Sequence, residues 1–449
     1  MKVDMINDSP SKSLIYFAIP MVIGNLFQQL YSVMDSIILG NFVGEEALAA
    51  VGSCMGIIML FIAIATGASV GCSVVISQLF GAKKIEDMKT SIFTALISVL
   101  CIGVFLSIIG HMVNIWLLRI MGTPDNIINK SSLYLKIYFY GLTFLFLYNV
   151  LAAIFNALGE SKIPLYFLIF SSILNIILDI VFVVYFKLDI IGVALALVLS
   201  QALISIVLFI CLLSRIRKIE SRESFSYFSA LALMQMSKIA IPSVIQQSLV
   251  SLGMIMVQVV VNRYGSSVMA GYAAAGKIDS VALMPMVTIG NAVSTFTAQN
   301  IGANKPDRIK RAYRASLGMI AFISLSITAL IYIFGENFLS VFLDINIDRQ
   351  AINTGIQYLR VVSLFYIVMG FMNVTNGVLR GSSDIFVYLL SSLINFGSRI
   401  GLTFYLDDVV GKDVIWWAIP IGWILSYIVS IIRYKSGKWK DKALIRKRD

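Results

Sequence analysis

The chain has 449 residues, of which 59% are hydrophobic and only 13% are charged. Soluble globular chains carry about 25% charged residues, so this composition excludes an ordinary soluble protein and predicts a chain that lies largely in a lipid bilayer. The formal net charge of +11 would suit a nucleic-acid partner, but the basic residues fall in short loops between apolar runs, so we expect no nucleic-acid partner.

Apolar runs long enough to cross a bilayer recur twelve times along the chain. About 20 residues suffice for one crossing, and short polar turns separate the runs. They cover residues 13–39, 48–79, 91–117, 132–157, 163–186, 190–213, 239–261, 269–300, 313–335, 354–379, 385–405 and 414–433. This pattern predicts an all-α polytopic membrane protein with twelve transmembrane helices.

Lys and Arg side chains gather in the segments that would lie on one side of the membrane. The two termini, the turns at Lys83, Lys162, Lys305 and Arg380, and the polar segment 214–238 hold most of the 35 basic residues. By the positive-inside rule, we expect both termini in the cytoplasm and a multi-pass protein of the cell (inner or plasma) membrane.

The chain carries no signature of an enzyme or of a transition-metal centre. It has one histidine, and its four cysteines lie inside apolar runs without a CxxC spacing. It has no HExxH motif and no nucleophile elbow. We therefore expect neither enzyme activity nor a cofactor.

The first half of the chain is repeated in the second half. The segment 18–84 recurs as residues 240–305, about 220 residues later, which is the size of a whole domain. Because each copy holds six spans, the copies are parallel repeats related by an axis along the membrane normal, as in transporters that work by alternating access. We expect two pseudo-symmetric six-helix bundles, residues 1–221 and residues 222–449 with the basic tail.

Polar side chains inside the spans of the first bundle mark a candidate site, because charges at membrane depth are costly. Asp35 lies in the first span, two turns after Gln28 on the same helix face. Asp179 lies in the fifth span, four residues after Asn175 and therefore on its face. Two carboxylates in low dielectric cannot both stay charged unpaired, so this bundle could bind a cation. Alternatively, each aspartate is a satisfied polar contact between helices.

The second bundle carries different charges. Lys277 and Asp279 lie in the eighth span, and Arg399 lies in the eleventh, where it aligns with Asp179 of the first repeat. We expect Lys277 and Asp279 either to pair with each other or to contact substrate, and we expect no second coupling site in this bundle.

Pro20 lies inside the first span. Proline removes a backbone hydrogen bond and bends a helix. Pro20 could act as a hinge that responds to the protonation of Asp35, or it could be a static kink that packing requires.

Together these motifs resemble the multidrug and toxic compound extrusion (MATE) family, over nearly the whole chain from about Leu14 to Tyr434. The residues that carry the resemblance are Ile19-Pro20, Asp35, Gln78-x-x-Gly81-Ala82 and Asn175-x-x-x-Asp179 in the first half, and Ile241-Pro242-Ser243, Asn291-Ala292, Gln299-Asn300-Ile301-Gly302-Ala303 and Leu379-Arg380-Gly381 in the second.

The resemblance implies a cation-coupled antiporter that exports organic, cationic or amphipathic small molecules as its two bundles rock around a V-shaped central cavity. It implies that Asp35, Asn175 and Asp179 form the cation-coupling site for H⁺ or Na⁺, with Asp35 and Asp179 as the ligands if the ion is the metal Na⁺. It also implies substrate contact at Gln28, and it makes Asn149 a further candidate near this site.

The chain departs from the family pattern in its sixth and seventh spans. A threonine that helps to ligate Na⁺ in some members would fall near Leu197, which cannot ligate, so the sequence does not favour Na⁺ over H⁺. Other members carry an acidic residue in the seventh span, where this chain has Gln246 and Gln247.

An alternative is a lipid-linked oligosaccharide flippase of the same superfamily. Lys277 and Arg399 favour this reading slightly, because a lipid pyrophosphate needs a cationic cavity. Twelve spans and the acidic first bundle argue against it. We expect small-molecule substrates, a lipid bilayer as the surroundings, and a monomer.

Overall fold

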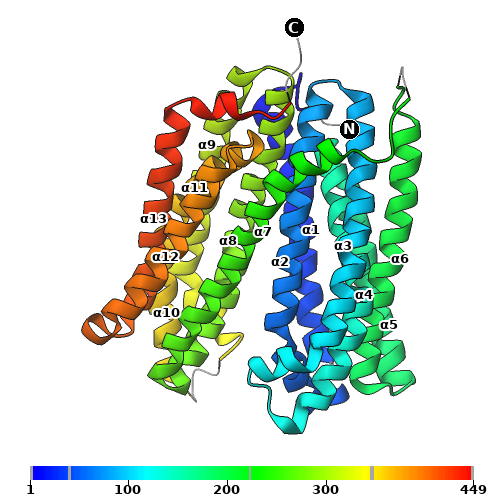
Figure 1. Cartoon of the computed structure of the whole chain (residues 1–449). Helices are drawn as coiled ribbons and strands as arrows, with labels where there is room; N and C mark the ends of the chain where they lie inside the picture. Colours follow the sequence, from blue (N-terminus) through cyan, green and yellow to red (C-terminus); the bar gives the residue numbers. More distant parts are fainter. Residues whose placement is uncertain (1–3, 39–41, 222–223, 344–347, 446–449) are drawn as a thin grey trace. The chain divides into compact units, whose positions relative to one another are not determined.

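The chain folds into long α-helices joined by short turns in the computed structural model (Figure 1). The structure describes residues 4–38, 42–221, 224–343 and 348–445, without the side chains of 30–33, 35–37, Glu45 and Val410.

The helices are α1 (Pro10–Ile38), α2 (Glu45–Gly81), α3 (Ile85–Ile120), α4 (Asp125–Ala157), α5 (Lys162–Asp179), α6 (Asp189–Arg217), α7 (Ala230–Val261), α8 (Ser266–Gly302), α9 (Pro306–Ser340), α10 (Arg349–Ser363), α11 (Tyr366–Gly381), α12 (Ile385–Val410) and α13 (Asp413–Lys435). Three shorter segments are the π-helix η2 (Ile180–Tyr185) and the 3₁₀ helices η3 (Asn262–Tyr264) and η4 (Lys438–Lys442).

The predicted all-α membrane fold is confirmed. Among the described residues, 10 helices are long and apolar enough to cross a membrane, or 11 if the bent pair α10 and α11 is one span. Helix α1, with 29 residues, is the remaining long helix and corresponds to the first predicted span. The V-shaped central cavity stays a prediction.

The tenth predicted span is not the single straight helix that its apolar run suggested. Helices α10 and α11 meet at an angle of 50°. The bend interrupts the backbone hydrogen bonds around Leu364, and the hydroxyl of Thr328 in α9 donates to the carbonyl of Ser363 over 2.7 Å. A neighbouring helix thus satisfies a carbonyl at the bend, as a broken helix in a membrane requires.

Packing divides the chain into two compact units. Of the described residues, one unit comprises those within 19–247, and the other comprises 4–18 and those within 248–445. The first part of α1 therefore packs with the second unit, and the first part of α7 packs with the first unit. The predicted boundary between residues 221 and 222 concerns the sequence repeat and stays a prediction.

Each unit has its own central helix. Helix α4 packs against α2, α3 and α6 in the first unit, and α8 packs against α9, α10 and α11 in the second. Glycines let α8 and α11 approach closely: a Cβ at Gly377 would lie 2.4 Å from the carbonyl oxygen of Gly290, and one at Gly381 would lie 2.3 Å from that of Ser294. Small residues at helix contacts are typical of membrane bundles.

The sequence repeat is also a repeat of backbone conformation. Gly44 precedes α2 with φ of 107°, and Gly265 precedes α8 with φ of 87°. After the same two helices, Lys83 and Asn304 take left-handed φ values of 59° and 57°. The repeated turns therefore direct the chain in the same way in both halves.

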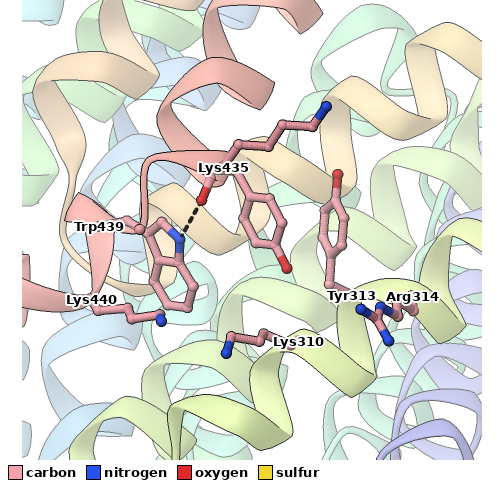
Figure 2. Close-up of a pocket in the computed structure, with 8 residues that line it drawn as sticks. Lys310, Tyr313, Arg314, Lys435, Trp439 and Lys440 are labelled. Atoms are coloured by element: carbon pink, nitrogen blue, oxygen red, sulfur yellow. Dashed lines mark hydrogen bonds between the residues drawn. The ribbon is translucent and has the colours of Figure 1, made fainter.

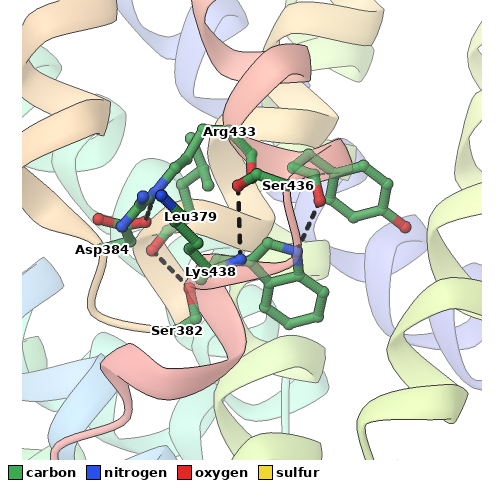
Figure 3. Close-up of polar contacts among 8 residues, drawn as sticks. Leu379, Ser382, Asp384, Arg433, Ser436 and Lys438 are labelled. Atoms are coloured by element: carbon green, nitrogen blue, oxygen red, sulfur yellow. Dashed lines mark hydrogen bonds and ion pairs between the residues drawn. The ribbon is translucent and has the colours of Figure 1, made fainter.

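Each half also has an ion pair between a turn and the end of its last helix. Glu160, in the turn between α4 and α5, pairs with Arg215 of α6. Asp384, in the turn between α11 and α12, pairs with Arg433 of α13 at 2.5 Å (Figure 3). These pairs fix the turn to the helix end in both units.

The polar segment between α6 and α7 packs on helix α3. The ammonium of Lys89, which is only 5% exposed, donates to the carbonyl of Ile219 over 2.6 Å. The hydroxyl of Thr94 accepts from the Ser229 N–H over 3.0 Å. The described part of this connection is therefore held against the first unit at two points.

Candidate functional site

The polar site of the first unit is built on helix α5 and faces α6. Asn175 is 2% exposed, and Asp179, the last residue of α5, is fully buried. With the amide oriented so that both of its ends are satisfied, Asn175 donates from Nδ2 to Asp179 Oδ2 over 2.9 Å. The predicted sharing of one helix face is therefore realised as a direct hydrogen bond between the two side chains.

Helix α6 completes this pair through its backbone. In the same orientation, Asn175 Oδ1 accepts from the N–H of Leu197 over 3.2 Å. The structure thus places Leu197 beside Asn175, although its side chain offers no oxygen ligand. One turn on the same helix, the buried hydroxyl of Ser200 donates to the carbonyl of Leu197 over 3.0 Å.

A change of helix type occurs directly after Asp179. Residues Ile180–Tyr185 form the π-helix η2, which continues α5 towards the turn before α6. π-helical turns are rare and frequently lie at functional sites, because they shift the register of the side chains and weaken the regular hydrogen-bond ladder. Sequence periodicity gave no signal for this segment.

Helix α1 carries three of the predicted residues. Pro20 lies inside the continuous helix, two residues after the point where α1 passes from one compact unit to the other. Gln28 is exposed, which leaves its amide accessible to a ligand. Asp35 belongs to α1 by its backbone, but its side chain lies outside the described part of the chain. Its assignment to the cation site stays a prediction.

Asn149 has an equivalent in the second repeat. Its amide nitrogen donates to the carbonyl of Leu145, one turn earlier in α4, over 2.8 Å. Asn373 of α11 makes the same bond to the carbonyl of Met369 over 3.0 Å. Because both halves share this arrangement, it supports a structural role for Asn149 and gives no evidence for substrate contact.

A buried polar cluster of the second unit surrounds Asp279 of α8. The hydroxyl of Tyr366 donates to Asp279 Oδ1 over 2.7 Å, and that of Tyr358 donates to Oδ2 over 3.2 Å. All three side chains are buried. The tyrosines come from either side of the bend between α10 and α11, so the bend brings two donors to one carboxylate.

Lys277 and Asp279 do not form the ion pair that was one expectation for them. Lys277 is exposed, and its ammonium lies 5.3 Å from the ring centroid of Phe342. Residues two apart on a helix face different directions. The cation that interacts electrostatically with Asp279 is instead Arg399 of α12. The buried Nε atom of Arg399 has no hydrogen-bond partner among the described residues.

The described residues include no group of three or more His, Cys, Asp and Glu side chains placed to hold a metal ion. Asn175 and Asp179 could supply oxygen ligands to Na⁺, or Asp179 could take up a proton. Either ion would neutralise the Asp179 carboxylate, which is fully buried. A buried charge is costly, so its neutralisation stabilises the protein more than neutralisation of an exposed charge would.

Sequence reasoning missed Tyr358 and Tyr366 as partners of Asp279. One signal was present, since Tyr358 belongs to the repeated Tyr-Leu-basic motif that also occurs at Tyr134. A lone aspartate in a span needs a donor, and a tyrosine hydroxyl is a suitable one. The contact with Tyr366 depends on the bend and had no signal in the sequence.

Comparisons with known proteins agree with the repeat. A family model described as MatE matches residues 20–181 and again residues 242–405. The probable multidrug resistance protein YoeA of Bacillus subtilis (strain 168) is 30% identical over 445 residues, which cover 97% of this chain and 95% of YoeA. The multidrug export protein MepA of Staphylococcus haemolyticus is 24% identical and covers 94% of this chain and 93% of its own.

Solved structures share the fold. A MOP superfamily transporter from Pyrococcus furiosus, described as having a binding pocket of reverse polarity, superposes with a TM-score of 0.90 at 23% identity over 98% of both chains. A multidrug resistance MATE family transporter in an outward-facing conformation gives a TM-score of 0.90 at 24% identity, over 98% of this chain and 99% of its own. At this level of identity the likeness establishes the fold alone.

Proposed function

The chain belongs to the MATE family, and on this basis we propose that it is a cation-coupled antiporter that exports organic, cationic or amphipathic small molecules. The names of its relatives as multidrug resistance and export proteins support efflux as the direction of transport. Its multi-pass helical fold supports transport across a membrane and not enzyme activity.

The observation that carries the coupling proposal is the buried Asn175–Asp179 pair. A carboxylate with no exposed surface is costly to keep charged, so a bound cation or proton stabilises it strongly. An ion drives a conformational change only if it binds one state more tightly than the other. The π-helix that follows Asp179 could change register when the carboxylate changes charge, and this would give the two states different ion affinities.

We assign Asp35 to the same site, as the second carboxylate of the first repeat, and Gln28 to substrate contact. Asp279 and Lys277 serve the substrate from the second repeat, with Asp279 held in place by Tyr358 and Tyr366. Pro20 serves as the hinge of α1. Both termini lie in the cytoplasm, and the protein works as a monomer in the cell membrane without a cofactor.

The coupling ion can be identified in proteoliposomes that contain the full chain and a fluorescent lipophilic cation. A pH gradient and a Na⁺ gradient are imposed separately, and export is followed in time. We expect the pH gradient to drive export at least as well as the Na⁺ gradient, because Leu197 supplies no side-chain oxygen beside Asn175. Export that responds to neither gradient would contradict antiport.

The role of Asp35 is tested with Asp35→Asn in the same assay. We expect export by this variant no longer to respond to the ion gradient, while circular dichroism shows that the protein is still folded. Export at the wild-type rate would remove Asp35 from the site. Binding of a lipid pyrophosphate without any transport of the small cation would instead favour the flippase.

A further inference from the structure

A pocket of about 250 Å³ opens at the end of the second unit where α13 meets the start of α9 (Figure 2). Four basic residues line it: Lys310 and Arg314 near the start of α9, Lys435 from the last turn of α13, and Lys440 from η4. The side chain of Lys435 extends away from the other three in Figure 2. The lining of the pocket includes no carboxylate. The pocket plays no part in the ion site of the first unit.

The pocket is shaped by the turn after α13. Gly437 has φ of +71°, a left-handed conformation that lets the chain reverse just beyond the helix. Trp439 is only 1% exposed, and its Nε1 donates to the carbonyl of Tyr434 over 3.0 Å. The chain beyond the last helix is therefore anchored here and brings Lys440 to the pocket.

Three aromatic rings form one wall of the pocket. The rings of Tyr313 and Tyr434 stack with centroids 4.1 Å apart, and those of Tyr434 and Trp439 stack at 5.7 Å with an angle of 6° between their planes. The Tyr313 hydroxyl forms a hydrogen bond with the hydroxyl of Thr375, over 3.0 Å. Such stacking holds the wall in one conformation, so the cations are presented on a preformed surface.

Lys310 and Arg314 are exposed and therefore accessible to an anion. Lys310 meets Asp307, one turn earlier in α9, at 2.9 Å, but the two side chains are 47% and 80% exposed. An exposed pair of this kind contributes little, so an incoming anion can displace Asp307 from Lys310. Arg314 is also exposed, and its planar guanidinium suits two oxygens of one phosphate group.

The position of the pocket indicates which anion it meets. It lies where two membrane-spanning helices end, and Tyr and Trp are enriched at this depth, at the level of the lipid headgroups. Basic pockets at helix ends recognise phosphate-bearing headgroups. We propose that this pocket binds a phosphate-bearing anion, and that the headgroup of an anionic lipid is its source.

Native mass spectrometry of the full chain in detergent tests this proposal. The dissociation constant of the first lipid adduct is measured for phosphatidylglycerol and for phosphatidylcholine with the same acyl chains. The pocket variant is Lys310→Gln with Arg314→Gln. The control variant is Lys84→Gln with Lys162→Gln, which removes the same charge from turns of the first unit. Inorganic phosphate is titrated separately by calorimetry.

We expect wild type and control to bind phosphatidylglycerol more tightly than phosphatidylcholine. The pocket variant should bind phosphatidylglycerol roughly 25-fold more weakly, since each removed charge accounts for roughly fivefold. Lys440→Gln, which changes only η4, should by itself weaken the binding of phosphatidylglycerol roughly fivefold.

The two sources of phosphate are told apart by the calorimetry. If inorganic phosphate binds to wild type but not to the pocket variant, the pocket takes phosphate from solution as well. If it does not bind, the acyl chains are needed and the ligand is a lipid. Equal affinity of pocket and control variants for phosphatidylglycerol, or equal affinity of wild type for both lipids, overturns the proposal.

Discussion

Helices α5 and α12 hold equivalent places in the two repeats, and each carries a buried asparagine followed four residues later by a charged residue. In α5 the pair is Asn175 and Asp179, and in α12 it is Asn395 and Arg399. The turns before and after the second helix of each repeat take the same backbone conformation. The charge that follows the asparagine is nevertheless reversed, from the buried Asp179 to the half-buried Arg399. The shared positions build the bundle, and the exchanged charge is the position at which we propose that the two copies differ in function.

We expect the largest loss of export from a change at Asp179, whose negative charge has no counterpart in the second repeat. Asp179→Asn keeps the size of the side chain but removes its charge, so the ion loses its differential affinity and shifts no equilibrium. We expect gradient-driven export in proteoliposomes to fall at least about tenfold.

The matched control for this change is Asp87→Asn, which alters an exposed aspartate in the first turn of α3. It should export at the wild-type rate. If Asp179→Asn does the same, the two repeats do not differ in function at this position.

A second comparison concerns the ion pairs that both repeats share. The side chains of Asp384 and Arg433 are 3% and 20% exposed, against 12% and 27% for Glu160 and Arg215. Breaking a buried pair leaves a charge without a partner, so Arg433→Gln should destabilise the protein by about 3–5 kcal/mol. Arg215→Gln should cost less, about 1–3 kcal/mol.

Thermal unfolding in detergent measures both changes. The double variants Arg433→Gln with Asp384→Asn and Arg215→Gln with Glu160→Gln should recover part of each loss, because no lone charge remains. Equal losses of stability in Arg433→Gln and Arg215→Gln would show that the difference in burial between the two ion pairs does not affect stability.

A third test addresses the two tyrosine hydroxyls that donate to the Asp279 carboxylate in the second repeat. Tyr366→Phe removes the shorter bond to Asp279 and should cost about 1–3 kcal/mol of stability. Tyr358→Phe removes the longer bond and should cost less. Tyr140→Phe, at a ring that is 65% exposed, serves as the control and should leave the melting temperature unchanged. If Tyr140→Phe lost more stability than Tyr366→Phe, the hydrogen bonds to Asp279 would not be a source of stability.

The smallest effect concerns the starts of equivalent helices. Asp348 caps α10, and the hydrogen bond from the Ala351 N–H is the main reason that the pKa of Asp348 lies below its ordinary value of 3.8. The N-cap position of helix α4 is occupied by Pro124, which offers no such cap. A lowered folded-state pKa gives stability that is present above the ordinary pKa and is lost as the pH falls through the lowered value.

Hydrogen exchange of the Ala351 amide, corrected for the intrinsic rate, should therefore accelerate as the pH falls below about 3.8. Asp348→Asn keeps a capping side chain that does not titrate in this range, so its exchange should lose this pH dependence. An identical pH profile for the two proteins would exclude this cap as the cause.

Much of the fold and part of the site could be predicted from the sequence. The apolar runs and the repeat gave the helices, the resemblance to the MATE family is confirmed, and the spacing of Asn175 and Asp179 gave their shared face. The bend before Tyr366 and the π-helix after Asp179 could not be predicted, because neither has a proline or a break in the apolar run. The bend and the π-helix depend on contacts between helices. The same is true of the hydrogen bonds that Tyr358 and Tyr366 donate to Asp279.

In the proposed mechanism, the Asp179 carboxylate of the first repeat releases its ion when substrate binds. The direct measurement is the number of protons or Na⁺ ions that purified protein releases when substrate binds, by calorimetry in buffers of different ionisation enthalpy and by a Na⁺ electrode. We predict release from wild type and from Asp87→Asn, and none from Asp179→Asn. Equal release from wild type and Asp179→Asn would contradict the assignment of the coupling ion to the first repeat.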